Sequence, residues 1–372
     1  MIKLIIPEVS LKAVARDYEK IFKSGMLTQG PYVKLFEKKV ARMIGVRYAF
    51  ATTSATTALH LSLAALGIGP GDEVLVADFT FPATANVVVQ LGAKPVLVDV
   101  RTDDFTIDIH DLKSKITRRT KAIMPVDTFG YPANMPAIIN VAKRHKLHVI
   151  EDAACSIGAR IAGRYCGSFP TMGCFSFHPR KSITTGEGGM LTTNDSTLAK
   201  TISVLRNHGG VFNESRGYYD YVEAGFNYRM SEIQAALGLS QFAQIKTIIK
   251  NRRHVAAIYN KAFAHHPYIT PPTEQKGRLH TYQSYVVKLH PDIPRDALMK
   301  KMRNRGIEVT LGTYSLHMQP FFRKKYGYRP GALPNSQAAF EHAMTLPLHA
   351  RMTQAQLSSV IKTLNKTIEE YV

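Results

Sequence analysis

The sequence predicts an α/β protein with a large domain built on a mainly parallel sheet and a smaller α+β domain after it. Strand-like and helix-like segments alternate from about residue 47 to residue 150. The strand-like segments are short and wholly apolar, as is typical of parallel strands that helices cover on both faces. The alternation stops near residue 245, so we expect a large domain over residues 1–245 and a small domain over residues 246–372.

Two helices precede the alternating segments. Residues 8–24 carry apolar side chains at helical spacing, and so do residues 33–44. The segment between them, residues 24–31, is rich in glycine, proline and other turn formers, which predicts a loop. We expect this helical N-terminal segment to belong to the large domain.

The rest of the chain predicts a regular series of elements. Strands are expected at residues 48–51, 73–76, 95–98, 122–126, 148–150 and 190–193, with helices at residues 56–66, 83–91 and 137–144. Farther on, we expect a long helix over about residues 231–265, a strand at residues 282–290, a helix at residues 295–305, a strand at residues 307–309 and a helix at residues 354–371. Because ligands bind beyond the carboxyl ends of parallel strands, polar residues at those ends are candidates for a site.

Composition and charge exclude several classes of protein. Hydrophobic residues make up 45% of the chain and charged residues 20%, which is ordinary for a globular enzyme. No apolar run approaches the roughly 20 residues that span a bilayer, and the start lacks a signal-peptide pattern, so we expect a cytoplasmic protein without a membrane partner. The net charge of +20 comes from scattered clusters that lack the aromatic pattern of a nucleic-acid site. It indicates a solvated basic surface or a field that attracts an anionic substrate.

The cysteines point to a reducing environment. Cys155, Cys166 and Cys174 have no CxxC spacing, and their number is odd. These features indicate reduced thiols and argue against a zinc site, so we expect no metal.

A lysine held between two strands is the strongest candidate for catalysis. The strand that contains residues 175–177 ends in a turn at Pro179, and Lys181 follows at the rim of that turn. The run Gly186-Glu187-Gly188-Gly189 then turns the chain back, because glycine accepts positive φ without a Cβ clash. A lysine fixed in this way suits a covalent bond to an aldehyde cofactor. The alternative, for any one lysine in so basic a chain, is a solvated surface charge.

Hydroxyl groups and an aromatic ring follow the first two strands. Residues 52–57 are rich in Ser and Thr and lead straight into a helix, which predicts either a phosphate site at the helix N-terminus or a plain N-cap. The segment contains neither GxGxxG nor GxxxxGK[ST], so a nicotinamide-dependent oxidoreductase and a P-loop protein are both disfavoured. Phe81, after the second strand, can lie flat against a heteroaromatic ring or can be a core residue.

Two acids, Glu151 and Asp152, directly follow the strand at residues 148–150. Burial of a carboxylate is costly without a partner, and a pyridinium N–H is such a partner. A carboxylate in that place keeps the ring nitrogen protonated, so the ring can act as an electron sink. The alternative for either acid is a solvated side chain or an N-cap. If Lys181 binds the cofactor, Asp152 is the acid that we expect to pair with the ring nitrogen.

These residues belong to a series of motifs that resembles one enzyme family. The motifs are Ser24-Gly25, Thr28-Gln29-Gly30, Thr56, Ala58-Leu59-His60, Thr80-Phe81, Glu151-Asp152-Ala153-Ala154, Ser176-Phe177-His178, Lys181, Thr185-Gly186-Glu187-Gly188-Gly189, Gly225-Phe226-Asn227-Tyr228-Arg229-Met230, Thr313-Tyr314 and Leu346-Pro347-Leu348-His349. In this order they resemble the sugar aminotransferases of the DegT/DnrJ/EryC1/StrS family, fold-type I enzymes that use pyridoxal phosphate. The resemblance implies a mainly parallel seven-stranded sheet flanked by helices and a smaller C-terminal α+β domain.

The resemblance also implies roles at the cofactor. Lys181 would bond covalently to the cofactor and would move a proton between the cofactor and the substrate carbon. Asp152 would pair with the pyridine nitrogen, and Phe81 would stack on the ring. The phosphate would be bound by Ala55, Thr56 and Ser176.

Other roles that the resemblance implies concern the assembly and the substrate. Asn227 resembles a residue that reaches the phosphate from the neighbouring subunit, so the expected assembly is a homodimer with shared active sites. The residues expected near the sugar nucleotide are His178, Arg229, Tyr314 and His317.

The chain departs from the family pattern at two positions. Cys155 stands where relatives usually have Gln or His beside the cofactor's 3-hydroxyl, and a thiol is only a weak donor. Asp127 stands where a His is frequent. Neither departure touches Lys181, whose presence argues against the branch of the family in which a His replaces the lysine and the enzymes are dehydratases.

The resemblance implies a reaction in two halves. An amino donor, most often L-glutamate, gives its amine to the cofactor, and a nucleotide-linked keto sugar then takes it, with Lys181 as the acid–base group in both halves. A 4-keto-6-deoxy sugar of surface-polysaccharide or deoxyaminosugar biosynthesis is the expected acceptor. A transaminase that acts on a keto-inositol remains the alternative. A non-catalytic regulatory protein that binds the cofactor is disfavoured, because it predicts loss of Lys181 or Asp152.

Overall fold

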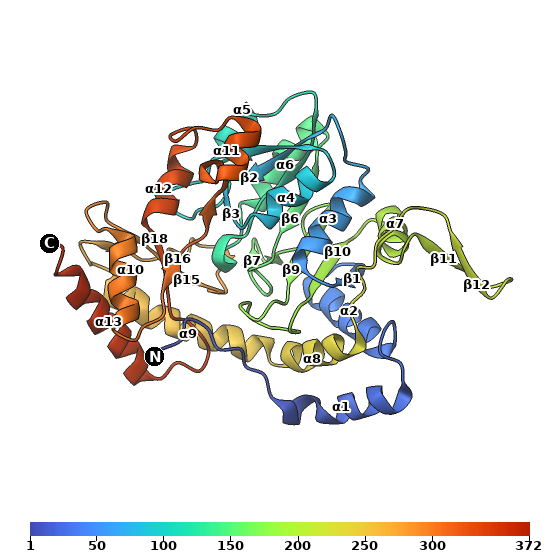
Figure 1. The fold of residues 1–372 in the computed structure, drawn as a ribbon, viewed down its shortest axis with the longest axis horizontal. Helices are drawn as coiled ribbons and strands as arrows, with labels where there is room; N and C mark the ends of the chain where they lie inside the picture. Colours follow the sequence, from blue (N-terminus) through green and yellow to red (C-terminus); the bar gives the residue numbers. More distant parts are fainter.

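The structure, a computed structural model, describes all 372 residues and is organised around a seven-stranded sheet (Figure 1). The strand order is β1-β10-β9-β6-β5-β2-β4, and only β10 runs against the others. The strands are β1 (Tyr48–Thr52), β2 (Glu73–Ala77), β4 (Lys94–Val98), β5 (Thr120–Met124), β6 (His148–Asp152), β9 (Met172–Ser176) and β10 (Gly189–Thr193). The predicted mainly parallel sheet of seven strands is therefore confirmed.

Helices cover both faces of this sheet because its strands are apolar on both sides. Along β2, Val74 and Val76 face a core shared with α3, α4 and α7, whereas Leu75 and Ala77 face a second core shared with α5 and α6. A third core joins α2 and α8 to the β1 side of the sheet. These helices are α2 (Pro31–Ile44), α3 (Ala55–Ala65), α4 (Ala83–Gln90), α5 (Ile109–Ser114), α6 (Met135–His145), α7 (Ser196–Arg206) and α8 (Glu232–Ala243).

The C-terminal part has its own antiparallel sheet in the order β13-β15-β18-β16. Its strands are β13 (Ile269–Thr270), β15 (Tyr285–Leu289), β16 (Thr310–Leu311) and β18 (Ala343–Leu346). A separate core packs this sheet against α9 (Ile245–Phe263), α10 (Arg295–Asn304) and α13 (Gln354–Ile368). The predicted α+β character of this part is confirmed.

Two predicted elements differ in the structure. The long helix expected over residues 231–265 is two helices, α8 and α9, because Gln244 between them has non-helical torsions of φ −102° and ψ 0°. The strand expected at residues 307–309 begins only at Thr310, and Ile307 forms just an isolated bridge with Ile2. Apolar spacing continues across both positions, so the pattern of side chains does not reveal either change.

One segment of the C-terminal part returns to the first sheet. β17 (Tyr314–Ser315) pairs with β3 (Phe79–Thr80). Asp99, just beyond β4, accepts hydrogen bonds from the first amides of α12 (Pro334–His342), at Asn335 and Ser336. The expected boundary near residue 245 lies beside the break between α8 and α9, and it stays a prediction.

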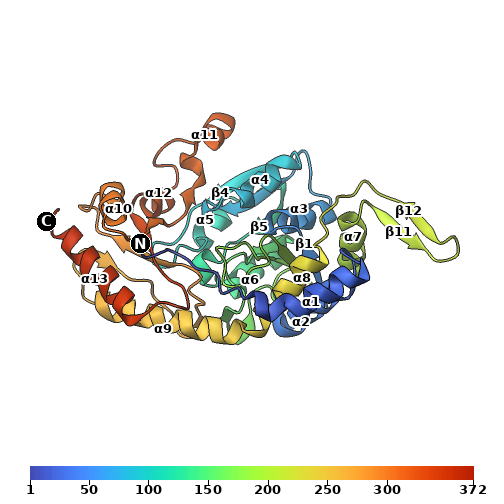
Figure 2. The ribbon, with the colours of Figure 1, turned by 60° about the horizontal axis from the view of Figure 1, so that its bottom comes forward.

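The N-terminal segment, which precedes the first sheet in the chain, packs against the C-terminal part. The amide of Leu348 donates to the carbonyl of Leu4 at 3.1 Å, and the chain then leads into α1 (Leu11–Ser24). Both termini consequently lie on the side of the second sheet (Figures 1 and 2).

The remaining elements are short. A hairpin of β11 (Gly210–Asn213) and β12 (Tyr218–Tyr221) projects from the body of the molecule in both ribbon views (Figures 1 and 2). The others are β7 (Arg160–Ile161), β8 (Arg164–Tyr165), β14 (Arg278–Leu279), α11 (Pro320–Tyr326), η1 (Thr128–Gly130) and η2 (Leu316–Met318). None of the helices has the length and apolar character that a membrane crossing requires.

Candidate active site

The loop between β9 and β10 holds Lys181 in a fixed frame. The amide of Lys181 donates to the carbonyl of His178 at 2.9 Å. Thr184 Oγ1 donates to the carbonyl of Phe177 at 2.9 Å, which ties the loop back to the end of β9. Lys181 itself is partly buried. Its side chain therefore starts from a backbone that is positioned by hydrogen bonds, unlike that of an ordinary surface lysine.

The glycines of the loop serve two different purposes. Gly186 has a φ of +85°, as predicted for the turn. At Gly189, a Cβ would lie 2.3 Å from the carbonyl oxygen of Ser54 and 2.7 Å from the amide nitrogen of Ala55, so the missing side chain lets β10 approach the start of α3. Gly189 also pairs with Ser176. Ser176 and Ala55 therefore both lie next to this glycine.

The start of α3 combines an N-cap with free amides. Ser54 accepts a hydrogen bond from the amide of Thr57 in a capping box. The amides of Ala55 and Thr56 are the first two of the helix, where no helical carbonyl can reach them. Both of the predicted readings of this segment are thus compatible, since the N-cap leaves two amides available for an anion.

Asp152 ends β6 and is buried. Thr84 Oγ1 donates to its Oδ2 at 2.7 Å, and the amide of Ala154 donates to its Oδ1 at 3.2 Å. Burial raises the pKa of Asp152, while these two donors and the nearby charge of Lys181 lower it. The carboxylate is therefore oriented by neutral donors and still lacks a full cationic partner. No sequence motif marked Thr84, because this contact joins residues that are 68 positions apart.

The amine of Lys181 has one close side-chain neighbour. Its Nζ lies 3.1 Å from Cys155 Sγ. Because a thiol is a weak hydrogen-bonding group, this contact leaves the amine only loosely held. The structure thus brings together three of the predicted residues, Lys181, Asp152 and Cys155.

Phe81 and Tyr314 form an aromatic pair at the edge of this region. The pairing of β17 with β3 puts Tyr314 opposite Thr80, and the ring centroids of Tyr314 and Phe81 lie 6.5 Å apart. The side chain of Phe81 is 65% exposed. An aromatic face that is open to solvent beside a candidate cofactor site is available for stacking, which a core phenylalanine would not be.

Arg229 and Asn227 lie beside the end of β1. Arg229 forms an isolated bridge with Thr52, and Asn227 forms one with Asn207. Arg229 Nη1 also donates to Asn207 Oδ1 at 2.7 Å. Asn227 is exposed. Its predicted role toward a second subunit stays a prediction.

The two predicted histidines differ in their surroundings. His178 is partly exposed, and its Nδ1 accepts from the amide of Arg180 at 3.1 Å. Burial lowers its pKa. His317 is wholly buried, with its Nδ1 2.6 Å from Asp78 Oδ2, while its Nε2 has no partner. The structure does not bring His317 to the open face of Phe81 and Tyr314, so its role near a substrate also stays a prediction.

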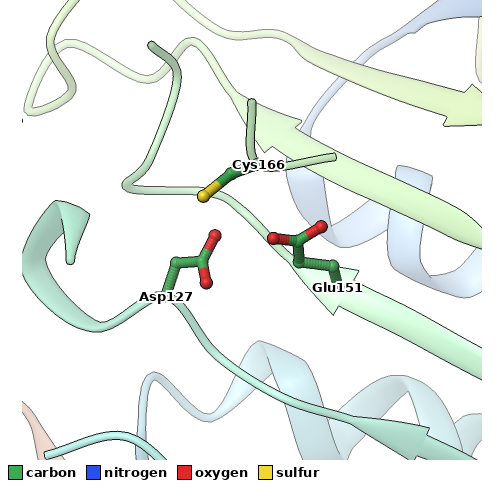
Figure 3. Close-up of side chains that lie close together, drawn as sticks. All are labelled: Asp127, Glu151 and Cys166. Atoms are coloured by element: carbon green, nitrogen blue, oxygen red, sulfur yellow. The ribbon is translucent and has the colours of Figure 1, made fainter. Parts of the chain in front are cut away.

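A buried acid cluster next to Asp152 was not predicted. Figure 3 shows the side chains of Asp127, Glu151 and Cys166 pointing toward one another, and their ligand-type atoms all lie within 4.8 Å. Glu151 Oε2 accepts from the amide of Gly167 at 2.6 Å, while Glu151 Oε1 has no such partner. The amide of Asp127 donates to the carbonyl of Asp152 at 3.1 Å, so the cluster is tied to the candidate site.

The acid cluster is best explained by a shared proton. Burial raises the pKa of Glu151 well above its usual value, and the charge of Asp127 raises it further. Burial also raises the pKa of Asp127. A protonated Glu151 can donate to Asp127, which removes one of two like charges from a buried site. The same oxygen and sulfur atoms could also hold a cation, but two carboxyl groups that favour protonation are poor ligands.

We expect Glu151→Gln to flatten the pH dependence of stability. A raised pKa in the folded state gives stability that is full below the unfolded pKa of 4.5 and is lost as pH rises through the folded pKa. Because Gln keeps a donor and does not titrate, the variant should gain on the order of 1 kcal/mol over wild type near pH 9. Thermal unfolding of both proteins from about pH 5 to about pH 9 measures the effect.

Glu151→Ala is the matched control, because it removes the donor and leaves a cavity, and it should be less stable at every pH. An unchanged slope in Glu151→Gln would contradict the shared proton. A rise in the Tm of wild type, but not of Glu151→Gln, on addition of Zn²⁺ would favour a cation instead.

A cavity of about 540 Å³ lies beside the lysine loop. Arg180, next to Lys181, lines it together with Lys3 and Arg303. One acid, Glu308, also lines it, so the three basic side chains leave the wall of the cavity with a net positive charge. Sequence patterns did not predict it, because Lys3 and Arg180 are far apart along the chain.

Comparisons with known proteins agree with this geometry. The model of the DegT/DnrJ/EryC1/StrS aminotransferase family matches residues 11–365. The chain is 38% identical over 374 residues to a GDP-perosamine synthase of Caulobacter vibrioides, covering 98% of this chain and 99% of that protein. It is 35% identical over 370 residues to the spore coat polysaccharide biosynthesis protein SpsC of Bacillus subtilis, covering 96% and 95%. Its fold matches Helicobacter pylori PseC, an aminotransferase involved in the biosynthesis of pseudoaminic acid, with a TM-score of 0.94, 27% identity and 100% coverage of both chains.

Proposed function

The chain is an aminotransferase of the DegT/DnrJ/EryC1/StrS family, whose members depend on pyridoxal phosphate, and we propose that it moves an amino group from L-glutamate to a nucleotide-linked keto sugar. The observation that carries the proposal is that the positioned amine of Lys181 lies near the buried carboxylate of Asp152. A 4-keto-6-deoxy sugar of polysaccharide or deoxyaminosugar biosynthesis is the acceptor that we favour. The spore coat and perosamine names of two relatives support that choice.

The residues around Lys181 fit pyridoxal phosphate. Asp152 is buried without a full cationic partner, and a protonated ring nitrogen would supply one. The free amides of Ala55 and Thr56 would bind the phosphate, together with the hydroxyl of Ser176, which pairs with Gly189 on the neighbouring strand. When bound, the cofactor supplies an electron sink for the bond changes at the substrate carbon.

Each of these residues does a separate part of the work. Lys181 would hold the cofactor and would move a proton at the substrate carbon. Asp152 would keep the ring nitrogen protonated, and Thr84 orients that carboxylate. Phe81, which is 65% exposed, would stack on the ring.

The positive charge beside the lysine loop supports an anionic acceptor. Lys3, Arg180 and Arg303 line the cavity of about 540 Å³ together with a single acid, Glu308. A sugar nucleotide carries a diphosphate, which such side chains bind through charge-assisted hydrogen bonds. The net charge of +20 adds a field that attracts an anion from a distance. A neutral keto-inositol would use none of these charges.

The projecting hairpin supports the proposed homodimer. Large apolar side chains of β11, β12 and the residues beside them are exposed, namely Val211, Phe212, Tyr218, Tyr219, Tyr221 and Val222. An arm that has no core of its own and displays apolar side chains needs a surface to cover it. We propose that a second copy of the chain covers it and that Asn227, six residues beyond Tyr221, thereby reaches the partner's phosphate site.

We expect Phe212→Asp with Tyr221→Asp to weaken both dimerisation and cofactor retention. Loss of two aromatic side chains that the proposed interface would cover should raise the dimer Kd by about 30-fold or more. Sedimentation gives the dimer Kd, and dialysis of the loaded protein gives cofactor retention. Phe321→Asp is the matched control, because Phe321 is 49% exposed and Phe212 is 52% exposed, but Phe321 lies on α11. A protein that is monomeric and still fully active would contradict the shared site.

Turnover with a panel of acceptors tests the proposed function. The purified protein is incubated with L-glutamate and with dTDP-, UDP- and GDP-linked keto sugars, and 2-oxoglutarate and the amino sugar are both measured. We expect amination of at least one 4-keto sugar nucleotide. Turnover of scyllo-inosose without turnover of any sugar nucleotide would replace the proposal with a keto-inositol transaminase.

A further inference from the structure

A small, partly open cavity lies beside the lysine loop. Its volume is about 10 Å³, and both Lys181 and Ser182 line it. The rest of its wall comes from the N-terminal segment of residues 5–8, from α8 and α9, and from His349 and Ala350. The cavity therefore lies where the loop, the N-terminal segment and the C-terminal part of the chain meet.

Unpartnered polar atoms concentrate around this cavity. Of the eleven buried side-chain nitrogen and oxygen atoms that lack a hydrogen-bond partner, five belong to four residues that line it. They are Glu8 Oε1, Ser182 Oγ, Arg252 Nε and both ring nitrogens of His349. Ser182, Arg252 and His349 are 8%, 3% and 2% exposed, so bulk water does not satisfy them. Burial of so many unpaired polar atoms at one place is costly, which points to a hydrogen-bonding partner that they share.

Charges and hydrogen bonds show that these residues form one group. Burial lowers the pKa of Arg252 to about 10, and the charge of Glu8 partly opposes that shift. Burial and then the charge of Arg252 lower the pKa of His349, which keeps its ring neutral. Arg252 Nη2 donates to the carbonyl of Gln283 at 3.2 Å, and Gln283 Nε2 donates to the carbonyl of Arg180 at 2.7 Å. The group is thus linked to the backbone next to Lys181.

Size and chemistry together identify the ligand. A cavity of about 10 Å³ has room for about one water molecule and none for a carboxylate-bearing substrate. Water accepts two hydrogen bonds and donates two. Arg252 Nε and the N–H of neutral His349 can donate to it, while Glu8 Oε1 and the other nitrogen of His349 can accept from it. The hydroxyl of Ser182 can take either role.

We propose that this cavity is a binding site for one internal water molecule, which joins Ser182 of the lysine loop to Arg252, His349 and Glu8. The water links the loop that carries Lys181 to α9 and to the segment after β18. The N-terminal segment closes the cavity, where Gln241 Nε2 donates to the carbonyl of Glu8 at 2.6 Å. Ser182 and His349 are therefore positioning residues for Lys181. The proposal depends on no assumption about the sugar substrate.

A crystal structure of the purified holoenzyme at a resolution that shows other buried waters tests the site directly. We expect density for one water within about 3.2 Å of at least three of the four side chains Glu8, Ser182, Arg252 and His349. A dry cavity would overturn the proposal, and so would a rearrangement in which the same atoms bond to one another.

Variants then test the positioning role. His349→Leu removes both ring nitrogens and should weaken cofactor retention by about tenfold, the equivalent of one lost hydrogen-bonded link. His349→Gln keeps a donor and an acceptor and should restore retention to within about threefold of wild type. His342→Leu is the control, because His342 Nδ1 is also buried without a partner but lies on α12, outside the cavity. Equal losses of retention in His349→Leu and His342→Leu, or no rescue by Gln, would overturn the positioning role.

Discussion

Lys181→Ala is expected to abolish transamination, with a loss of turnover of about 10⁴-fold or more. The substitution removes both the covalent attachment of the cofactor and the group that moves the proton at the substrate carbon. The near-visible absorbance band of the purified protein should disappear or shift to that of free cofactor. Steady-state kinetics and the absorption spectrum measure the two effects independently.

Lys200→Ala is the control for this prediction. Lys200 is an exposed residue of α7, so its loss should leave both the spectrum and the turnover unchanged. If Lys181→Ala and wild type showed the same absorbance band, another group would hold the cofactor and the assignment of Lys181 would be wrong.

Asp152→Asn is expected to reduce turnover by about 10²- to 10⁴-fold while the cofactor still binds. The oxygen of the new amide can still accept from the amide of Ala154, and its NH2 group can donate to the Thr84 hydroxyl, but it has no charge with which to keep a ring nitrogen protonated. Stopped-flow measurement of the half-reaction with glutamate should locate the loss in the proton-transfer step.

Thr84→Val provides a graded comparison. It keeps the charge of Asp152 and removes the hydroxyl that orients it at 2.7 Å, together with that hydroxyl's contacts to Thr80 Oγ1 and the carbonyl of Phe81, so the expected loss of turnover is about fivefold. A loss in Asp152→Asn no larger than that in Thr84→Val would contradict the role of the charge. If both variants were as stable to heat as the wild type, a general folding defect would be excluded as the cause.

The main sheet was predictable from sequence because the apolar patterns that indicate it lie within single short segments of the chain. Apolar runs such as residues 74–77 of β2 and 122–124 of β5 are buried on both faces of the sheet, and the helices between the strands have regular apolar spacing. Lys181 and Asp152 were also predictable. Asp152 ends β6 and Lys181 follows β9, and the carboxyl ends of these parallel strands lie at one edge of the sheet. The family resemblance then supplied the roles of individual residues.

Other features depend on contacts between distant parts of the chain. The acid cluster needs Asp127, Glu151 and Cys166 to converge from three separate segments. The return of β17 to β3 depends on pairing between residues more than 200 positions apart. Apolar spacing predicts which face of a segment is buried but not its partner, so neither feature could be read from the sequence.

Peptide mapping after borohydride reduction of the purified protein is the most direct test of the central claim. Reduction makes the bond between a lysine amine and the cofactor's aldehyde permanent, so the modified lysine can be identified by mass spectrometry. We expect the added mass on the peptide that contains Lys181 and on no other peptide. Modification of a different lysine, or of none in a protein that transaminates, would contradict the account.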